Sequence, residues 1–122
     1  MTSSLRRPDG GLWSDLDGAV LLAGGAGDLA GMRRIAAALS PRAHATVLVE
    51  AADAPSPERL DALGARVTWL VRGDRRHGER LAAAIHAWCA EWSCPGGPVC
   101  TVWLAARTPA RIVRMTRALL PS

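Results

Sequence analysis

Four short apolar runs, separated by segments of helical periodicity, limit how this chain can fold more than any other feature. The runs are Ala19–Ala23, Ala45–Glu50, Arg66–Val71 and Val99–Ala105. Runs that are apolar at successive positions are typical of strands covered on both faces of a sheet. Their alternation with helical segments indicates an α/β fold, in which helices flank a parallel sheet.

A helical segment follows each apolar run. Apolar residues recur at three- and four-residue intervals in Leu29–Leu39 and in Gly78–Trp92. Proline is favourable at the first position of a helix, so a final helix is expected from Pro109 to about Leu119. A shorter helix is predicted over Glu58–Leu63.

The length and the terminal sequence indicate one cytoplasmic domain. The chain has 122 residues, which suits a single core. The polar residues 1–17 are predicted to form a flexible N-terminal arm, and residues 18–122 the folded α/β domain. No apolar run approaches the roughly 20 residues of a membrane helix, and no secretory signal follows Arg6 and Arg7. We therefore expect a protein that does not bind a membrane.

The charge pattern does not predict nucleic-acid binding. The net charge is +4, and all fifteen basic residues are arginine. They are spread along the chain rather than gathered in one stripe. The exception is a short cluster, Arg72, Arg75, Arg76 and Arg80. This cluster fits either an anion-binding loop or a solvated loop.

Cysteine and histidine spacing gives no metal or catalytic site. Cys89, Cys94 and Cys100 are expected to be free thiols in a reducing compartment. His86, Cys89 and Cys94 match no standard zinc spacing and lack a fourth ligand, so no metal site is predicted. The sequence offers no Ser-His-Asp or Cys-His set, so no catalytic residue is predicted either.

The segments directly after the four predicted strands are the candidate binding loops. In doubly wound sheets, ligands bind beyond the carboxyl ends of the strands, near the point where strand order reverses. The segments here are Gly24–Asp28, Glu50–Asp53, Arg72–Asp74 and Ala105–Thr108.

The glycine turn of the first loop has two interpretations. Glycine lets a phosphate approach the backbone closely, and a helix N-terminus attracts anions. Yet Gly25-Ala-Gly27 and Gly31 do not fit Gly-x-Gly-x-x-Gly in register, and the Asp28 carboxylate could fill the N–H groups itself. The motif alone favours a capped strand-to-helix corner over a phosphate site.

Three strand-end motifs occur in a characteristic order, namely Val49-Glu-Ala-Ala-Asp53, Val67-Thr-Trp-Leu-Val-Arg72 and Val102-Trp-Leu-Ala-Ala-Arg107. They resemble the Val-Glu-x-Ala-Asp, Val-x-Trp-Leu-x-Arg and Val-Trp-x-Ala-Gly-Glu motifs in the C-terminal domain of siderophore-interacting proteins. These proteins are flavin-dependent ferric-siderophore reductases of the ferredoxin-reductase-like superfamily. The resemblance runs from about Ala19 to Leu119, and Trp-Leu-x-Arg is its most specific part.

The resemblance implies a fold and a cofactor. It implies a Rossmann-like three-layer sandwich around a four-stranded parallel sheet of order 3-2-1-4. In that family this domain binds the reduced nicotinamide cofactor, and a separate N-terminal barrel carries FAD. NADPH would then have its pyrophosphate beside the glycine turn and its 2′-phosphate beside Arg72. The predicted cofactor-binding residues are Gly24, Gly25, Ala26, Gly27, Asp28, Glu50, Arg72 and Arg107.

The departures from the family pattern shape the functional hypotheses. Gly25, Ala26 and Gly27 replace acidic and hydroxyl residues, Arg107 replaces a glutamate, and no flavin barrel precedes Ala19. FAD is therefore not expected on this chain alone, and neither is catalysis. One hypothesis is a stand-alone module that binds NAD(P)H for a separately encoded flavin and ferric-siderophore reductase component. The alternatives are a degenerate, non-catalytic protein-interaction module and an unrelated small-molecule binder.

The expected strand order also suggests a partner surface. Residues 99–105 would form an uncovered edge strand, which invites pairing with another chain. Trp88 and Trp92 would extend that contact, whereas Trp69 and Trp103 are predicted to pack in the core. We therefore expect a homodimer, or a partner protein such as a flavin domain.

Overall fold

The computed structural model describes residues 4–6, 13, 18–53, 66–93 and 96–120. Its strands are β1 (Ser4–Arg6), β2 (Ala19–Gly25), β3 (His44–Ala51), β4 (Arg66–Val71) and β5 (Cys100–Leu104). Its helices are the 3₁₀ turn η1 (Ala26–Asp28), α1 (Leu29–Ala38), α2 (Glu79–Trp92) and α3 (Ala110–Leu119). The helix predicted over residues 58–63 lies outside the described residues.

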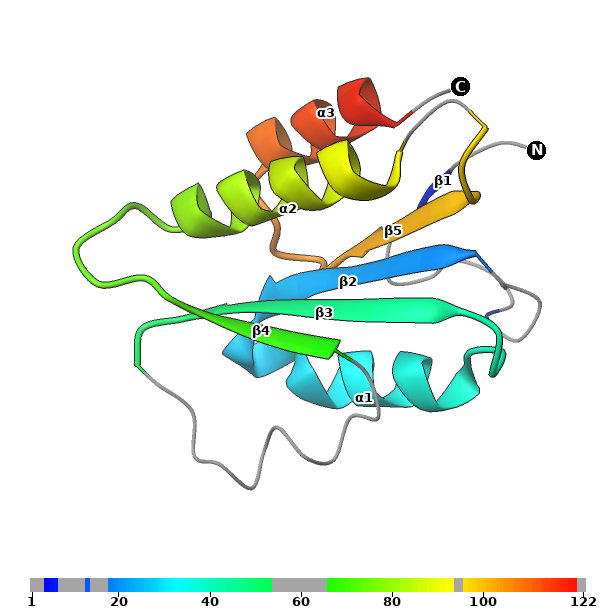
Figure 1. Ribbon diagram of the computed structural model, residues 1–122. Coiled ribbons are helices and arrows are strands. Elements are labelled where there is room, and N and C mark those ends of the chain that lie inside the picture. The colour runs from blue at the N-terminus through cyan, green and yellow to red at the C-terminus, as the bar shows by residue number, and fades with distance from the viewer. Residues whose placement is uncertain (1–3, 7–12, 14–17, 54–65, 94–95, 121–122) are drawn as a thin grey trace.

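The architecture is the predicted α/β sandwich. All neighbouring strands are parallel, in the order β1-β5-β2-β3-β4. Helix α1 covers one face of the sheet, and α2 and α3 cover the other (Figure 1). Successive residues of β2 point to opposite faces, so Leu21 packs with α2 while Leu22 packs with Met32 of α1. The four strands expected from the sequence adopt the order implied by the family resemblance.

The sheet differs from the prediction at one edge, because it has five strands rather than four. Ser4–Arg6, which we expected to belong to a flexible arm, pairs with β5 in parallel, and Arg6 lies opposite Trp103. The prediction that residues 99–105 form an uncovered edge is therefore wrong. Pairing with β1 satisfies backbone groups that an apolar strand such as β5 would otherwise leave open.

The tryptophans divide between the core and its margin. Trp103 is 5% exposed and belongs to the core on the α1 side, as predicted, and Trp69 packs against the same core. Trp88 of α2, also 5% exposed, packs in the core between the helix and the sheet, and it is not the surface contact that we expected. Trp92 is half-buried and stacks on Trp88 and on His44. No helix in the described part of the chain is long and apolar enough to cross a bilayer.

The thiol of Cys89 gives a chemical test of this packing. Cys89 and Cys100 are buried and form no disulfide in the described part of the chain. Burial, with a smaller effect of Cys100, raises the pKa of Cys89 from 9.0 to about 11. At pH 8 we expect iodoacetamide to alkylate native Cys89 about 100-fold more slowly than an unperturbed thiol, because less thiolate is present.

Peptide mass spectrometry before and after denaturation measures this difference, and equal rates in both states would contradict the buried position.

The raised pKa of Cys89 also affects stability at alkaline pH. Below about pH 9 the Cys89 thiol is mostly protonated in both the folded and the unfolded chain, so it gives the free energy of unfolding no pH dependence. Between about pH 9 and 11 the unfolded chain loses a proton that the folded chain keeps, so the free energy of unfolding falls.

Candidate functional site

A cavity of about 600 Å³ lies at the carboxyl ends of β2 to β5. The chain leaves β2 towards β3 through α1 on one face, and it returns from β4 to β5 through α2 on the other. The loops after β2 and β5 therefore diverge and leave space between them. All eight predicted cofactor-binding residues line this strand-end cavity, which is formed by Gly24–Asp28, Glu50–Ala52, Arg72, His77, Gly78, Leu81 and Arg107–Pro109.

The glycine turn is a self-capped corner. The Gly25 N–H donates to Asp28 Oδ2 at 2.9 Å, so this carboxylate does occupy part of the turn. Among the described glycines, none in the turn has a positive φ. A Cβ atom built at Gly24 would lie 2.7 Å from Met32 Cε and 3.0 Å from the Ala105 Cβ atom, so close packing disfavours a side chain there. A Cβ atom at Gly27 would meet nothing within 4 Å, so the protein itself does not require that glycine.

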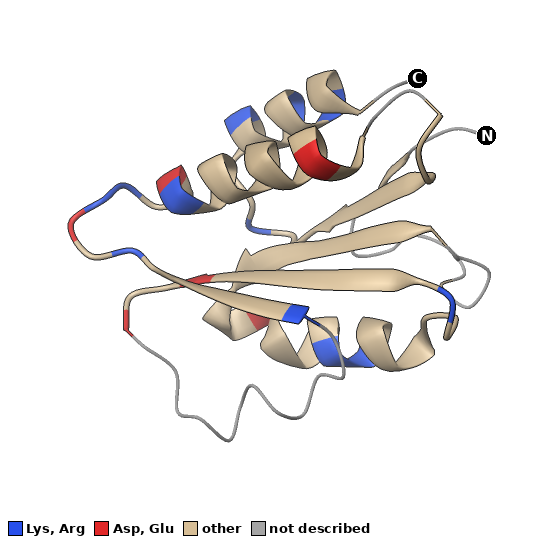
Figure 2. Ribbon diagram, viewed as in Figure 1, with Lys and Arg blue, Asp and Glu red and all other residues tan. Residues whose placement is uncertain are grey.

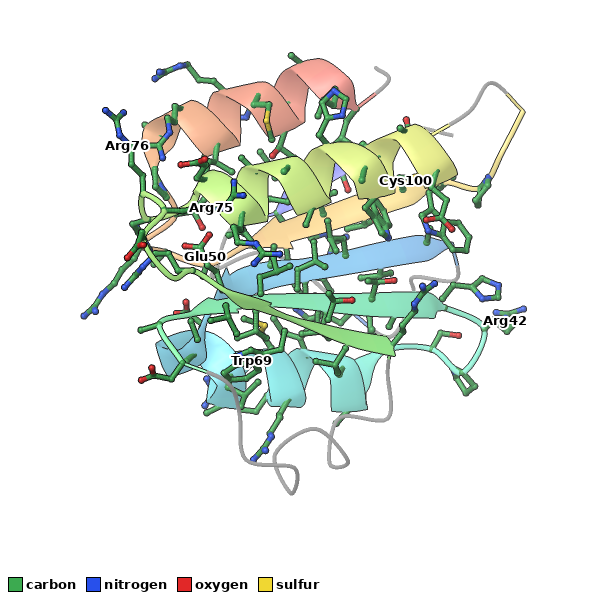
Figure 3. The ribbon with its side chains drawn as sticks, turned by 60° about the vertical axis from the view of Figure 1, so that its left-hand side comes forward. Arg42, Glu50, Trp69, Arg75, Arg76 and Cys100 are labelled. Carbon is green, nitrogen blue, oxygen red and sulfur yellow. The ribbon has the colours of Figure 1, made fainter. Side chains whose placement is uncertain are left out.

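Glu50 caps helix α2, a role that the sequence did not reveal. Its carboxylate is 5% exposed and accepts the Gly78 N–H at 2.6 Å and the Leu81 N–H at 3.0 Å. Figure 3 shows Glu50 at the same end of the sheet as Arg75 and Arg76. Both carboxylate oxygens therefore accept hydrogen bonds from the backbone at the N-terminus of α2, the end of a helix where a negative charge is most stabilising.

Gly78 lets the chain enter α2 at this point. Its φ is +88°, in the left-handed region, and a Cβ atom there would lie 2.7 Å from Ile112 Cδ1 of α3. The Arg111 guanidinium donates to the His77 carbonyl oxygen at 2.9 Å, which ties the same loop to α3. The loop from β4 to α2 forms one wall of the cavity. It is thus bound to β3 through Glu50 and to α3 through Arg111.

Two arginines supply the positive charge of the cavity. Arg72 follows β4 and Arg107 follows β5, and β2 and β3 separate these two strands in the sheet. Within the described parts of the chain, neither guanidinium makes a hydrogen bond or an ion pair. By contrast, Arg75 pairs with Glu79 at 3.3 Å, and Arg80 donates to the Val71 carbonyl oxygen at 2.9 Å. Figure 2 shows basic residues in the loop before α2 and in the connection from β5 to α3.

The arrangement suits the binding of an anion. The cavity holds two arginines that can form charge-assisted hydrogen bonds with phosphate or carboxylate groups. Its two carboxylates, Asp28 and Glu50, already accept backbone N–H groups. Among the residues that the structure describes, no three potential metal ligands lie together, and Cys94 lies outside that set.

The capping role of Glu50 can be tested by substitution. We expect Glu50→Ala to lower the free energy of unfolding by about 2 kcal/mol, because two buried N–H groups lose their acceptor. Glu79→Ala is the control, since its ion pair with Arg75 and its hydrogen bond from the Arg76 N–H are both at the surface and contribute little. Urea unfolding followed by circular dichroism measures both, and equal losses would argue against a buried cap.

Comparison with known proteins identifies the family. The profile of one family, described as siderophore-interacting protein, matches residues 18–121. Comparisons with curated proteins and with solved structures gave no significant match. The matched region contains every described element except β1, together with all the residues that line the strand-end cavity. The chain therefore belongs to the siderophore-interacting protein family, which supports a general role in siderophore interaction.

Proposed function

We propose that the strand-end cavity binds NADPH and that the chain serves a separately encoded flavin and ferric-siderophore reductase component. The observation that carries this proposal is a pair of guanidinium groups, Arg72 and Arg107, that lie in one cavity at the strand ends and have no partner among the described residues. The cavity volume of about 600 Å³ also lies within the usual range for cofactor sites. Family membership supports the link to ferric siderophores.

The charges of the cavity suit a nucleotide with two separate anionic groups. NADPH carries a pyrophosphate and a 2′-phosphate, and a planar guanidinium can hold either by paired hydrogen bonds. The Gly25 N–H already donates to Asp28, so the proposal puts the phosphates beside the arginines and Gly27. The open side of Gly27 leaves room for a ligand to approach the backbone.

The position of Glu50 favours NADPH over NADH. An acidic residue at the end of the second strand of a dinucleotide fold commonly accepts the ribose 2′-hydroxyl of NAD, whereas an arginine accommodates the 2′-phosphate of NADP. In this chain that carboxylate is used by α2, and Arg72 lies on the neighbouring strand end. When bound, the nicotinamide supplies a hydride, while residues of this chain bind and orient it.

Calorimetric titration with NADPH tests the two arginines. We expect Arg72→Gln and Arg107→Gln each to weaken binding about 10-fold or more, because each removes a charge-assisted contact. Arg72→Gln should also reduce the preference for NADPH over NADH. Arg114→Gln on the exposed side of α3 is the matched control and should bind normally. Equal affinity in all three variants would exclude this site.

Gly27→Ala separates binding from folding. The substitution should leave the melting temperature unchanged or slightly higher, since a Cβ atom meets nothing within 4 Å and φ is not positive. It should weaken NADPH binding, because the methyl group would occupy space beside the ligand. If the folded wild-type chain failed to bind NADPH at millimolar concentration, the protein-interaction hypothesis would replace this proposal.

A further inference from the structure

The Trp-Leu-x-Arg motif at the end of β4 contains a tryptophan whose role the proposed site leaves open. Arg72 lines the strand-end cavity, whereas Trp69 does not. We propose that Trp69 is a positioning residue for the ligand. Its indole N–H fixes the three residues that leave β3, Ala51–Asp53 (the β3 exit segment), and this segment shapes the adenosine side of the cavity. The role rests on the proposed function, because it acts on the same cavity.

A hydrogen bond joins Trp69 to the far end of the β3 exit segment. Trp69 Nε1 donates to the Asp53 carbonyl oxygen at 2.8 Å. Trp69 lies opposite Val49 in the sheet, and an extended continuation of β3 would carry Asp53 about 13 Å beyond Val49. The chain therefore turns back after β3 to reach the indole, which packs on the α1 side of the sheet (Figure 3). The bond fixes the direction in which the chain leaves the strand.

A second hydrogen bond holds the near end of the same segment. The Arg72 N–H donates to the Ala51 carbonyl oxygen at 2.8 Å. Two residues of one motif thus hold the two ends of the β3 exit segment, with Ala52 between them. Ala51 and Ala52 line the strand-end cavity next to Glu50. A displacement of Asp53 would therefore move a wall of the cavity.

The indole bond is better suited to ordering this segment than to stabilising the core. It lies at the surface, where water can replace either partner, so its net contribution to folding is modest. Trp88 and Trp103 have buried indole N–H groups with no partner among the described residues, so the fold forms with indole donors unpaired elsewhere. Asp53 makes no other hydrogen bond within the described parts of the chain. Loss of the donor should free the segment locally while the sheet stays intact.

The place of the segment in the fold indicates which half of the ligand it would contact. In dinucleotide folds, the residue at the end of the second strand of the unit contacts the ribose of the adenosine. Here that strand is β3, beside β2 in the sheet, and that residue is Glu50. Ala51 and Ala52 follow it, and their small side chains let a ribose or an adenine ring approach the backbone. Trp69 should therefore affect the adenosine half of NADPH.

Trp69→Phe tests this role, because it removes the donor and keeps a ring against the core. Calorimetric titration should show NADPH and adenosine 2′,5′-bisphosphate, which lacks nicotinamide, weakened by the same factor of about 3 to 10. Trp103→Phe is the matched control, since it makes the same change in the same core at an indole without a partner among the described residues. It should bind both ligands normally. A lower melting temperature of Trp69→Phe with both affinities unchanged would indicate a merely structural role and overturn the proposal.

Hydrogen exchange in the wild-type chain tests the same role without relying on the fold of a variant. If the ligand needs the ordered exit segment, the bound ligand must in turn favour the bond between Trp69 and Asp53. NMR should show slower exchange of the Trp69 indole N–H at saturating adenosine 2′,5′-bisphosphate, and unchanged exchange would overturn the proposal.

The wild-type titrations separate this inference from the proposed function. If NADPH bound but adenosine 2′,5′-bisphosphate did not bind up to about 10 mM, the assignment to the adenosine half would be wrong. If neither ligand bound, the proposed function would fail, and the role of Trp69 with it. Normal wild-type binding of both ligands with unchanged affinity in Trp69→Phe would overturn the role of Trp69 alone.

Discussion

A buried carboxylate joins the end of β3 to the first turn of α2, and the strand-end cavity depends on this contact. Burying a charge is costly unless it is fully hydrogen-bonded, and Glu50 meets that condition through the Gly78 and Leu81 N–H groups. The helix in turn has its positive end neutralised by a residue from the sheet. Because the contact fixes where α2 begins, it also fixes the loop that carries Arg72 to the cavity.

This use of the carboxylates explains the electrostatic character of the cavity. Asp28 accepts one backbone N–H group and Glu50 accepts two, so both carboxylates are held by the protein. Arg72 and Arg107 have no such partners in the described structure. The two arginines therefore remain available as hydrogen-bond donors to an anion, although the formal charges of the two acids and the two arginines balance.

Much of the fold was predictable from the sequence because each central strand is an apolar run followed by a turn. The rule for strand ends then brought together residues as distant as Gly24 and Arg107. Strand β1 was not predictable, since Ser4–Arg6 is too short and polar to show a period. The role of Glu50 was missed because its partners lie 28 and 31 positions further on. One signal was present: Gly78 begins α2 without a side-chain cap of its own.

The three glycines around the first helix show how sequence and structure together separate packing from function. A Cβ atom at Gly24 would crowd Met32 and Ala105, whereas a Cβ atom at Gly27 or Gly31 would clash with nothing. Residues that break a local preference without a structural gain are expected mainly at functional sites. Gly27 lines the strand-end cavity, so that cavity is where its open side could matter. A substitution at Gly27 therefore tests the proposed cofactor site more directly than it tests the stability of the fold.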